Sequence, residues 1–231
     1  KMTIKKIFRE NERPDLPIRN VFSLISTAKV IQKRIMFDMS LTKKDIALLL
    51  QFNQSQYFPD IREPLVFDYH LLSHTDHSQE YLVLGARQCE VENQKKRIHG
   101  LGLTLTSLEP ESYALLRIVL YHYRAIQENQ QYAALFLLEE GMRLIAFNHQ
   151  MILYETHDLQ EFQLFFSETP SLTLCFIVST TPVSSDLIDE ISERLKTTIR
   201  IINPLAQIDH STSEFSTADF LLPFGAALRG I

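Results

Sequence analysis

Residues 172–178 limit the possible folds of this chain more than any other segment. They read LTLCFIV, and a run with a single polar residue is typical of a strand that is buried on both faces. Helical and strand patterns alternate through the rest of the chain. The class is therefore predicted to be α/β or α+β, because neither helices nor strands alone account for the whole pattern.

Ten segments are predicted to be strands and six to be helices. The strands come from short apolar or alternating runs at 21–25, 30–37, 65–72, 81–84, 103–108, 133–138, 143–147, 151–154, 172–178 and 198–202. The helices begin near Ser40 or Thr42 (ending before Pro59), at Glu90, Pro110, Leu159, Ser185 and Ala218. Thr42 and Asp45 have the spacing of a capping pair, and the last helix is strongly apolar at residues 220–224.

Composition excludes several classes of protein. The 231 residues carry a net charge of −5, which gives no electrostatic footprint for nucleic acid. Two widely spaced cysteines without a CxxC motif fit a reducing compartment and exclude a disulfide framework or a zinc site. No apolar run reaches the ~18 residues that a membrane span needs, and no signal peptide is recognised at the start.

Two clusters of possible metal ligands are predicted to be ordinary solvated segments. Residues 74–77 read HTDH, but a metal site needs three or four converging ligands and no partner cluster is present nearby. Glu139 and Glu140 are neighbours, and neighbours on a strand point to opposite faces. We therefore expect no metal, and we also expect no nucleophile elbow because no GxSxG motif occurs.

Seven short motifs occur in an order that resembles one protein family. They are YFP at 57–59, DY at 68–69, LGAR at 84–87, GL at 102–103, SYALLR at 112–117, NP at 203–204 and FGAALRG at 224–230. Each motif is weak alone, but their order and their spacing from Tyr57 to Arg117 resemble PilM, the actin-like protein of type IV pilus assembly and competence. The resemblance covers most of the chain.

The resemblance implies an α/β, actin-like (ribonuclease H-like) fold with an inserted small α+β subdomain. A first lobe is expected at 1–130, with the inserted strand–helix–strand–strand–helix subdomain at about 21–105. A second lobe is expected at 131–231. Only about 25 residues separate Glu155 from Ser179, so this second lobe is expected to be reduced and to lack much of the family's helical part.

The sequence departs from the family where nucleotide would bind. Actin-like proteins hold ATP with glycine-rich turns, because glycine lets backbone N–H groups crowd the phosphates. Residues 137–141 read LLEEG and residues 178–182 read VSTTP, which together hold one glycine and two acidic side chains. We therefore expect no cofactor and no ATPase activity. An ATP-binding switch remains the alternative, since an upstream segment would supply the first phosphate loop.

In PilM-like proteins a groove beside the inserted subdomain captures the N-terminal tail of the inner-membrane protein PilN. The resemblance therefore implies a cytoplasmic scaffold that reaches the membrane through partners, with pilus motor ATPases as further partners. The candidate contact residues are Phe58, Pro59, Phe67 and Tyr69. Core packing is the alternative role for all four. A GspL-like type II secretion scaffold is a second alternative, and FtsA ranks low because no amphipathic membrane helix follows Arg229.

Overall fold

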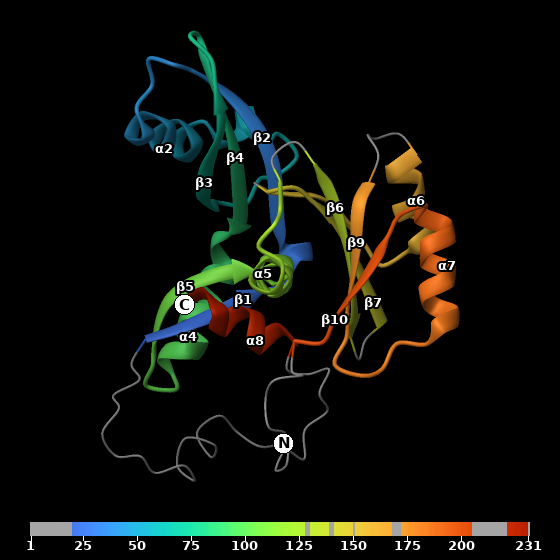
Figure 1. Cartoon of the computed structure of the whole chain (residues 1–231). Coiled ribbons are helices and arrows are strands. Elements are labelled where there is room, and N and C mark those ends of the chain that lie inside the picture. The colour runs from blue at the N-terminus through green and yellow to red at the C-terminus, as the bar shows by residue number, and fades with distance from the viewer. Residues whose placement is uncertain are drawn as a thin grey trace. The chain divides into compact units, whose positions relative to one another are not determined.

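The chain folds into two compact units, Lys1–Pro110 and Glu111–Ile231. The structure, a computed structural model, describes residues 20–127, 130–138, 141–149, 151–167, 172–204 and 221–230 (Figure 1). Within these residues no helix is long and apolar enough to cross a membrane. The lobes predicted from the resemblance, 1–130 and 131–231, stay a prediction, because the two units are a division by contacts within the chain.

A three-stranded antiparallel sheet in the order β2-β4-β3 forms the larger part of unit 1. Its strands are β2 (Val30–Asp38), β3 (Leu65–His74) and β4 (Ser78–Arg87), and β3 and β4 form a hairpin. Helix α2 (Lys43–Phe52) covers one face of this sheet. The core between them is built from the following side chains: Ile35, Phe37, Ile46, Leu50, Phe58, Leu65, Tyr81 and Val83.

Two further strands of unit 1 pair with each other across a long stretch of sequence. β1 (Asn20–Ile25) and β5 (Thr104–Pro110) form a separate two-stranded parallel sheet. The short 3-10 helix η1 (Thr27–Lys29) joins β1 to β2, and α4 (Gln88–His99) joins β4 to β5. Both strands were predicted, but the sequence alone did not pair them with each other.

Unit 2 is built on a five-stranded mixed sheet in the order β10-β9-β6-β7-β8. The antiparallel strands β6 (Gln131–Leu138), β7 (Gly141–Phe147) and β8 (Ile152–Thr156) form a meander. β9 (Leu172–Val178) pairs in parallel with β6, and β10 (Ile199–Ile202) pairs in parallel with β9. The predicted strand 172–178 is confirmed, but its burial on both faces holds only for residues 175–178, since Thr173 is exposed.

Helices cover both faces of the unit 2 sheet, as Figure 1 shows. One face packs against α5 (Glu111–His122) and α8 (Leu221–Ala227), which is followed by the 3-10 helix η3 (Leu228–Gly230). The other face packs against α6 (Leu159–Ser167) and α7 (Ser185–Leu195). Alternate side chains of β9 serve the two cores, Phe176 and Val178 on one side and Cys175 and Ile177 on the other.

Three of the predicted helix boundaries need correction. The helix expected to run to Pro59 breaks at Asn53, where α2 ends and the four-residue helix α3 (Gln54–Tyr57) begins. α7 takes Ser184 rather than Ser185 as its N-cap, through a hydrogen bond from the Leu187 N–H to the Ser184 hydroxyl. Pro110 ends β5 and lies immediately before α5 rather than in its first turn.

Candidate partner-binding surface of unit 1

Helix α2 is fixed at its start by a complete capping box, as the sequence predicted. The Thr42 hydroxyl accepts from the Asp45 N–H at 3.3 Å, and the Asp45 carboxylate accepts from the Thr42 N–H at 2.9 Å. Hydrogen bonds from Thr42 also hold the pKa of the Asp45 carboxyl below its ordinary value. Ser40 does not cap the helix. Ile46 and Leu50, one turn apart, are then fully buried against the sheet.

The loop after α3 is held in place by one amide side chain. Gln54 Nε2 donates to the backbone oxygens of Ile61 and Glu63, and Gln54 Oε1 accepts from the Leu65 N–H at 2.9 Å. This clamp spans the segment that carries Phe58 and Pro59, so a loop of ordinary length has a defined conformation. The sequence analysis missed Gln54, because an amide in a polar stretch carries no distinctive signal.

Phe58 lies in the core of unit 1, with 4% of its surface exposed. Its ring stacks on that of Phe67, with the centroids 5.3 Å apart. Lys33 covers the same ring, with Nζ 5.7 Å from its centroid, and donates to the Tyr57 carbonyl at 2.7 Å. Pro59, the next residue, is exposed.

Phe67 and Tyr69 are half-buried on β3 and pack against the same core. The Tyr69 hydroxyl donates to the Lys43 carbonyl at 2.9 Å, and its ring meets that of Tyr81 edge-on at 5.8 Å. Gly85 on β4 lies under Phe67: a Cβ there would come within 3.3 Å of the Phe67 ring. Phe58, Phe67 and Tyr69 therefore all pack on the core of unit 1, and Pro59 is the one member of the predicted set that is classed as exposed.

Exposed apolar side chains lie on both sides of the subdomain, and the sequence analysis missed them. On α2, Leu48 and Phe52 are 42% and 76% exposed, and they lie one turn apart on the face away from the core. On the sheet face opposite α2, Met36 and Val66 are 58% and 45% exposed. Their spacing is visible in the sequence, but exposure at those positions depends on which face the tertiary fold covers.

The first of the two segments weighed as metal sites forms an ordinary turn. Residues 74–77 form the turn of the β3–β4 hairpin, where the Thr75 N–H donates to the Ser78 carbonyl at 2.8 Å. Across the described ranges no group of three or more His, Cys, Asp or Glu side chains is placed to hold a metal ion. Glu139 and Glu140 lie outside the described residues.

Residues 178–182 are the segment expected to face an adenosine. Two residues of this segment, Ser179 and Thr181, form hydrogen bonds with each other. Ser179 is 2% exposed, and its hydroxyl donates to the Thr181 carbonyl at 2.8 Å and accepts from the Thr181 N–H at 3.1 Å. This segment follows the carboxyl end of β9, the end at which open α/β sheets bind ligands. The Ser179 hydroxyl is thus engaged with Thr181, and the Ser179 N–H donates to the Ile202 carbonyl on β10 at 3.1 Å.

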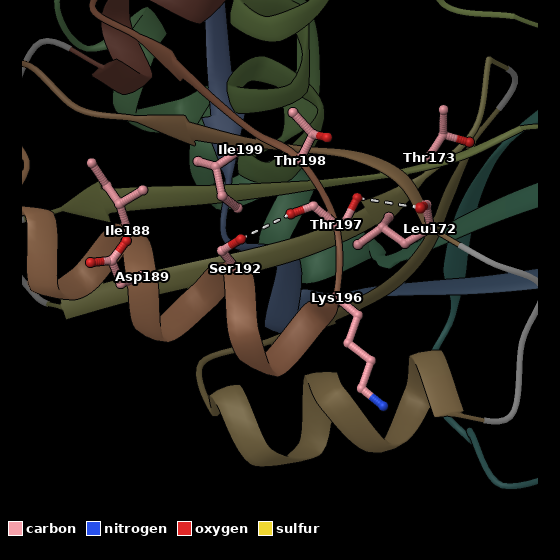
Figure 2. Close-up of a pocket in the computed structure, with 9 residues that line it drawn as sticks. All are labelled: Leu172, Thr173, Ile188, Asp189, Ser192, Lys196, Thr197, Thr198 and Ile199. Atoms are coloured by element: carbon pink, nitrogen blue, oxygen red, sulfur yellow. Dashed lines mark hydrogen bonds between the residues drawn. The ribbon is translucent and has the colours of Figure 1, made fainter.

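A hollow of about 740 Å³ lies at the other end of β9, between that strand, the start of β10 and helix α7. Figure 2 shows its lining: Leu172, Thr173, Ile188, Asp189, Ser192, Lys196, Thr197, Thr198 and Ile199. Ser192 donates to the Thr197 carbonyl at 3.2 Å, and the Thr197 hydroxyl donates to the Leu172 carbonyl at 3.3 Å. These bonds close the α7–β10 turn, where Lys196 adopts a left-handed conformation at φ 49°. The hollow is therefore the space beside the turn that ends α7, and these hydrogen bonds of its lining residues hold that turn in place.

A buried ionic cluster fixes the first turn of α5 to the unit 2 sheet. Arg143 on β7 lies 3.3 Å from Glu111 and 3.7 Å from Glu155, measured between guanidinium nitrogen and carboxylate oxygen. The Ser112 hydroxyl donates to Glu155 at 2.5 Å. Burial, with a smaller contribution from the Glu155 charge, raises the pKa of the Tyr113 hydroxyl to about 12. The sequence shows these residues only as scattered charges.

The architecture defines an actin-like protein. Its mixed five-stranded sheet is covered by helices on both faces, and a small α+β subdomain is inserted ahead of it. The predicted fold class is confirmed, including the reduced helical part of the second half.

Comparison with known proteins places this actin-like chain in a family. The family model for type IV pilus assembly protein PilM matches residues 2–157. The chain therefore belongs to the PilM family, as the seven motifs suggested. No curated protein matches it.

Among solved structures, the PilM-PilN type IV pilus biogenesis complex matches with a TM-score of 0.68 and 18% identity, over 92% of this chain and 80% of that one. At this identity the likeness shows the fold. The cytoplasmic domain of EpsL, an inner-membrane component of the type II secretion system of Vibrio cholerae, matches at TM-score 0.48 and 13% identity, over 96% and 78%. A Bacteroides thetaiotaomicron protein with an actin-like ATPase fold and unknown function matches at 0.43 and 15%, over 90% and 77%.

Proposed function

We propose that this chain is a cytoplasmic scaffold of type IV pilus assembly that docks the cytoplasmic N-terminal tail of a PilN-like inner-membrane protein. The observation that carries the proposal is the PilM family match together with a fold shared with the PilM of a PilM-PilN complex. The chain would reach the membrane through this partner, and pilus motor ATPases are further proposed partners.

The burial of the four predicted residues supports two different proposed roles for them. Phe58 is too buried to offer a partner much surface, so Phe58, Phe67 and Tyr69 would support the docking surface from below. Pro59 would touch the tail, since it is exposed on the loop that Gln54 clamps. A tail with apolar anchors also needs exposed apolar counterparts, and Phe52 is the most exposed large apolar side chain among the described residues.

The same proposal assigns the chain no ATPase activity. A phosphate cradle needs several backbone N–H groups that point at the ligand, and glycine usually supplies the close approach. Gly141 is the one glycine of the 137–141 turn, and the polar groups around Ser179 bond to each other. Titration calorimetry with Mg-ATP tests this part: heat from binding below millimolar ATP would overturn it, and no heat is expected.

Binding of the tail is tested by fluorescence anisotropy with a labelled peptide from the N-terminus of the neighbouring PilN-like protein. Two matched variants then locate the tail-binding surface. Phe52→Ser changes the exposed face of α2, and Met36→Ser changes the sheet face opposite α2. Both residues are more than half exposed, so neither change should alter folding.

We expect Phe52→Ser to weaken tail binding by about 30-fold, the loss of a ~2 kcal/mol aromatic anchor, and Met36→Ser to leave it unchanged. If Met36→Ser weakened binding and Phe52→Ser did not, the docking surface would lie on the sheet face opposite α2. No binding of the wild-type chain at high micromolar concentration would contradict the scaffold function.

A further inference from the structure

The last turn of α4 presents three consecutive cations that form no ion pair with the described residues of the chain. Lys95, Lys96 and Arg97 are consecutive and all exposed, and His99 follows them. In the part of the chain that the structure describes, none of the three lies within ion-pair distance of a carboxylate. A helix dipole favours cations at this end, but that effect does not require three long side chains in sequence.

Packing fixes the direction in which these cations point. The opposite face of α4 is held by Ile98, which is 7% exposed, and by Gln94, whose Nε2 donates to the Ser23 hydroxyl at 2.8 Å. Lys95, Lys96 and Arg97 are exposed on the remaining sides of this last turn, where successive side chains point about 100° apart around the helix axis. The packed face therefore fixes where on unit 1 this basic helix end lies.

An apolar loop follows the cations directly. The helix ends in consecutive turns, with hydrogen bonds from the Leu101 N–H to the Ile98 carbonyl and from the Gly102 N–H to the His99 carbonyl. Gly102 adopts φ +79°, which allows the chain to reverse there. Leu101 and Leu103 on this loop are half-exposed. Cations beside a small apolar loop are the combination that the headgroup region of a bilayer accommodates.

The charges of the chain are distributed unevenly between the two units. The sequence of unit 1 holds 16 Lys and Arg against 13 Asp and Glu, whereas unit 2 holds 7 against 15. The excess of positive charge in unit 1 belongs to residues 1–19, and residues 20–110 hold ten residues of each sign. An anionic surface therefore repels the strongly acidic unit 2 much more than unit 1, which favours an approach through unit 1.

We propose that the basic end of α4, formed by Lys95, Lys96 and Arg97 with the Leu101 loop, rests on the anionic phospholipid surface of the membrane. Three cations give weak binding alone, because each contributes only a several-fold gain in affinity near an anionic leaflet. Where the proposed tail docking holds the chain beside the membrane, the effective lipid concentration is high and weak binding is enough. The lipid contact itself does not depend on that docking.

Vesicle flotation with the full chain and no partner peptide tests the contact. Vesicles of phosphatidylethanolamine with phosphatidylglycerol are compared with vesicles of phosphatidylcholine alone. We expect binding to the anionic vesicles only, lost at 1 M salt, where the Debye length falls to about 3 Å. Lys95→Gln/Lys96→Gln/Arg97→Gln should lower the lipid partition coefficient by roughly 100-fold.

A charge-matched control separates this site from the general charge of unit 1. Lys43→Gln/Lys44→Gln/Arg62→Gln removes the same charge from other exposed positions and should retain most of the binding. An equal loss in both variants, absence of wild-type binding, or equal binding to neutral vesicles would each overturn the proposal. So would binding to a polyanion such as heparin, lost in the α4 variant, without vesicle binding. Because no partner peptide is present, failure here leaves the tail-docking proposal intact.

Discussion

Gly225 lies where α8 meets α5 with no room for a side chain. A Cβ at this position would lie 2.1 Å from the Ala114 carbonyl oxygen and 2.6 Å from its carbon. Both are backbone atoms, so no side-chain rotation relieves the overlap. The Gly225 carbonyl also accepts a hydrogen bond from Arg117 at 2.7 Å, which holds the two helices at this distance.

Gly225→Ala should therefore destabilise unit 2. Overpacking costs about 3 kcal/mol at the upper end of its usual range, and alanine recovers ~1 kcal/mol over glycine inside a helix. The net loss is about 2 kcal/mol, which lowers the melting temperature by roughly 4–8 °C in a chain of this size.

Differential scanning calorimetry of wild type, Gly225→Ala and Gly225→Ala/Ile118→Ala measures this loss. The third variant removes the Ile118 side chain, 3.3 Å from the same Cβ, and should not restore stability because the backbone contact remains. Ala227→Ser, at an exposed position of the same helix, is the control and should change little. A Gly225→Ala chain as stable as wild type would refute the close approach of α5 and α8.

Three other outcomes follow from buried or paired groups. Arg143→Met leaves two half-buried carboxylates without their cation and should cost about 2 kcal/mol in urea unfolding; an unchanged midpoint would contradict the cluster. Hydrogen bonds from Arg34 lower the pKa of Glu80 below its ordinary 4.5, so the stability from this pair is present above pH 4.5 and lost as pH falls through the folded value. Arg34→Gln should flatten that acid loss in pH-dependent melts. Cys89 is exposed, whereas burial raises the pKa of Cys175 to about 12, so maleimide should label Cys89 alone in the native chain and both after denaturation.

Local patterns predicted the elements well, because most of them depend on neighbours in sequence. Thr42 and Asp45 are three residues apart, and their capping box formed as expected. The run 172–178 was predicted to be buried on both faces because it contains a single polar residue. Residues 175–178 of β9 are buried in this way. The seven sequence motifs also indicated the PilM family, whose family model matches residues 2–157.

Contacts between segments that are distant in the sequence could not be predicted from the sequence. The pairing of β1 with β5 joins residues some 84 positions apart, such as Asn20 and Thr104, and nothing in either strand specifies the other. The Arg143 cluster likewise draws on α5, β7 and β8. Such arrangements are set by packing of whole elements, which one sequence does not reveal.

The partner-contact role of Phe58, Pro59, Phe67 and Tyr69 stays a prediction. The aromatic character of residues 58, 67 and 69 was visible, but a sequence does not distinguish a buried ring from an exposed one when both follow the same alternation. The structure places Phe58 in the core and leaves Phe52 at 76% exposure, because α2 turns its Ile46 and Leu50 stripe toward the sheet. We therefore propose that exposed neighbours of this aromatic core, such as Phe52, contact the tail.

The scaffold proposal is tested most directly by titrating this chain with the N-terminal tail peptide of its neighbouring PilN-like protein in nucleotide-free buffer. Saturable binding at micromolar peptide, unchanged by added Mg-ATP and weakened by Phe52→Ser, is the predicted result. An absence of binding without nucleotide, or binding that requires Mg-ATP, would contradict it.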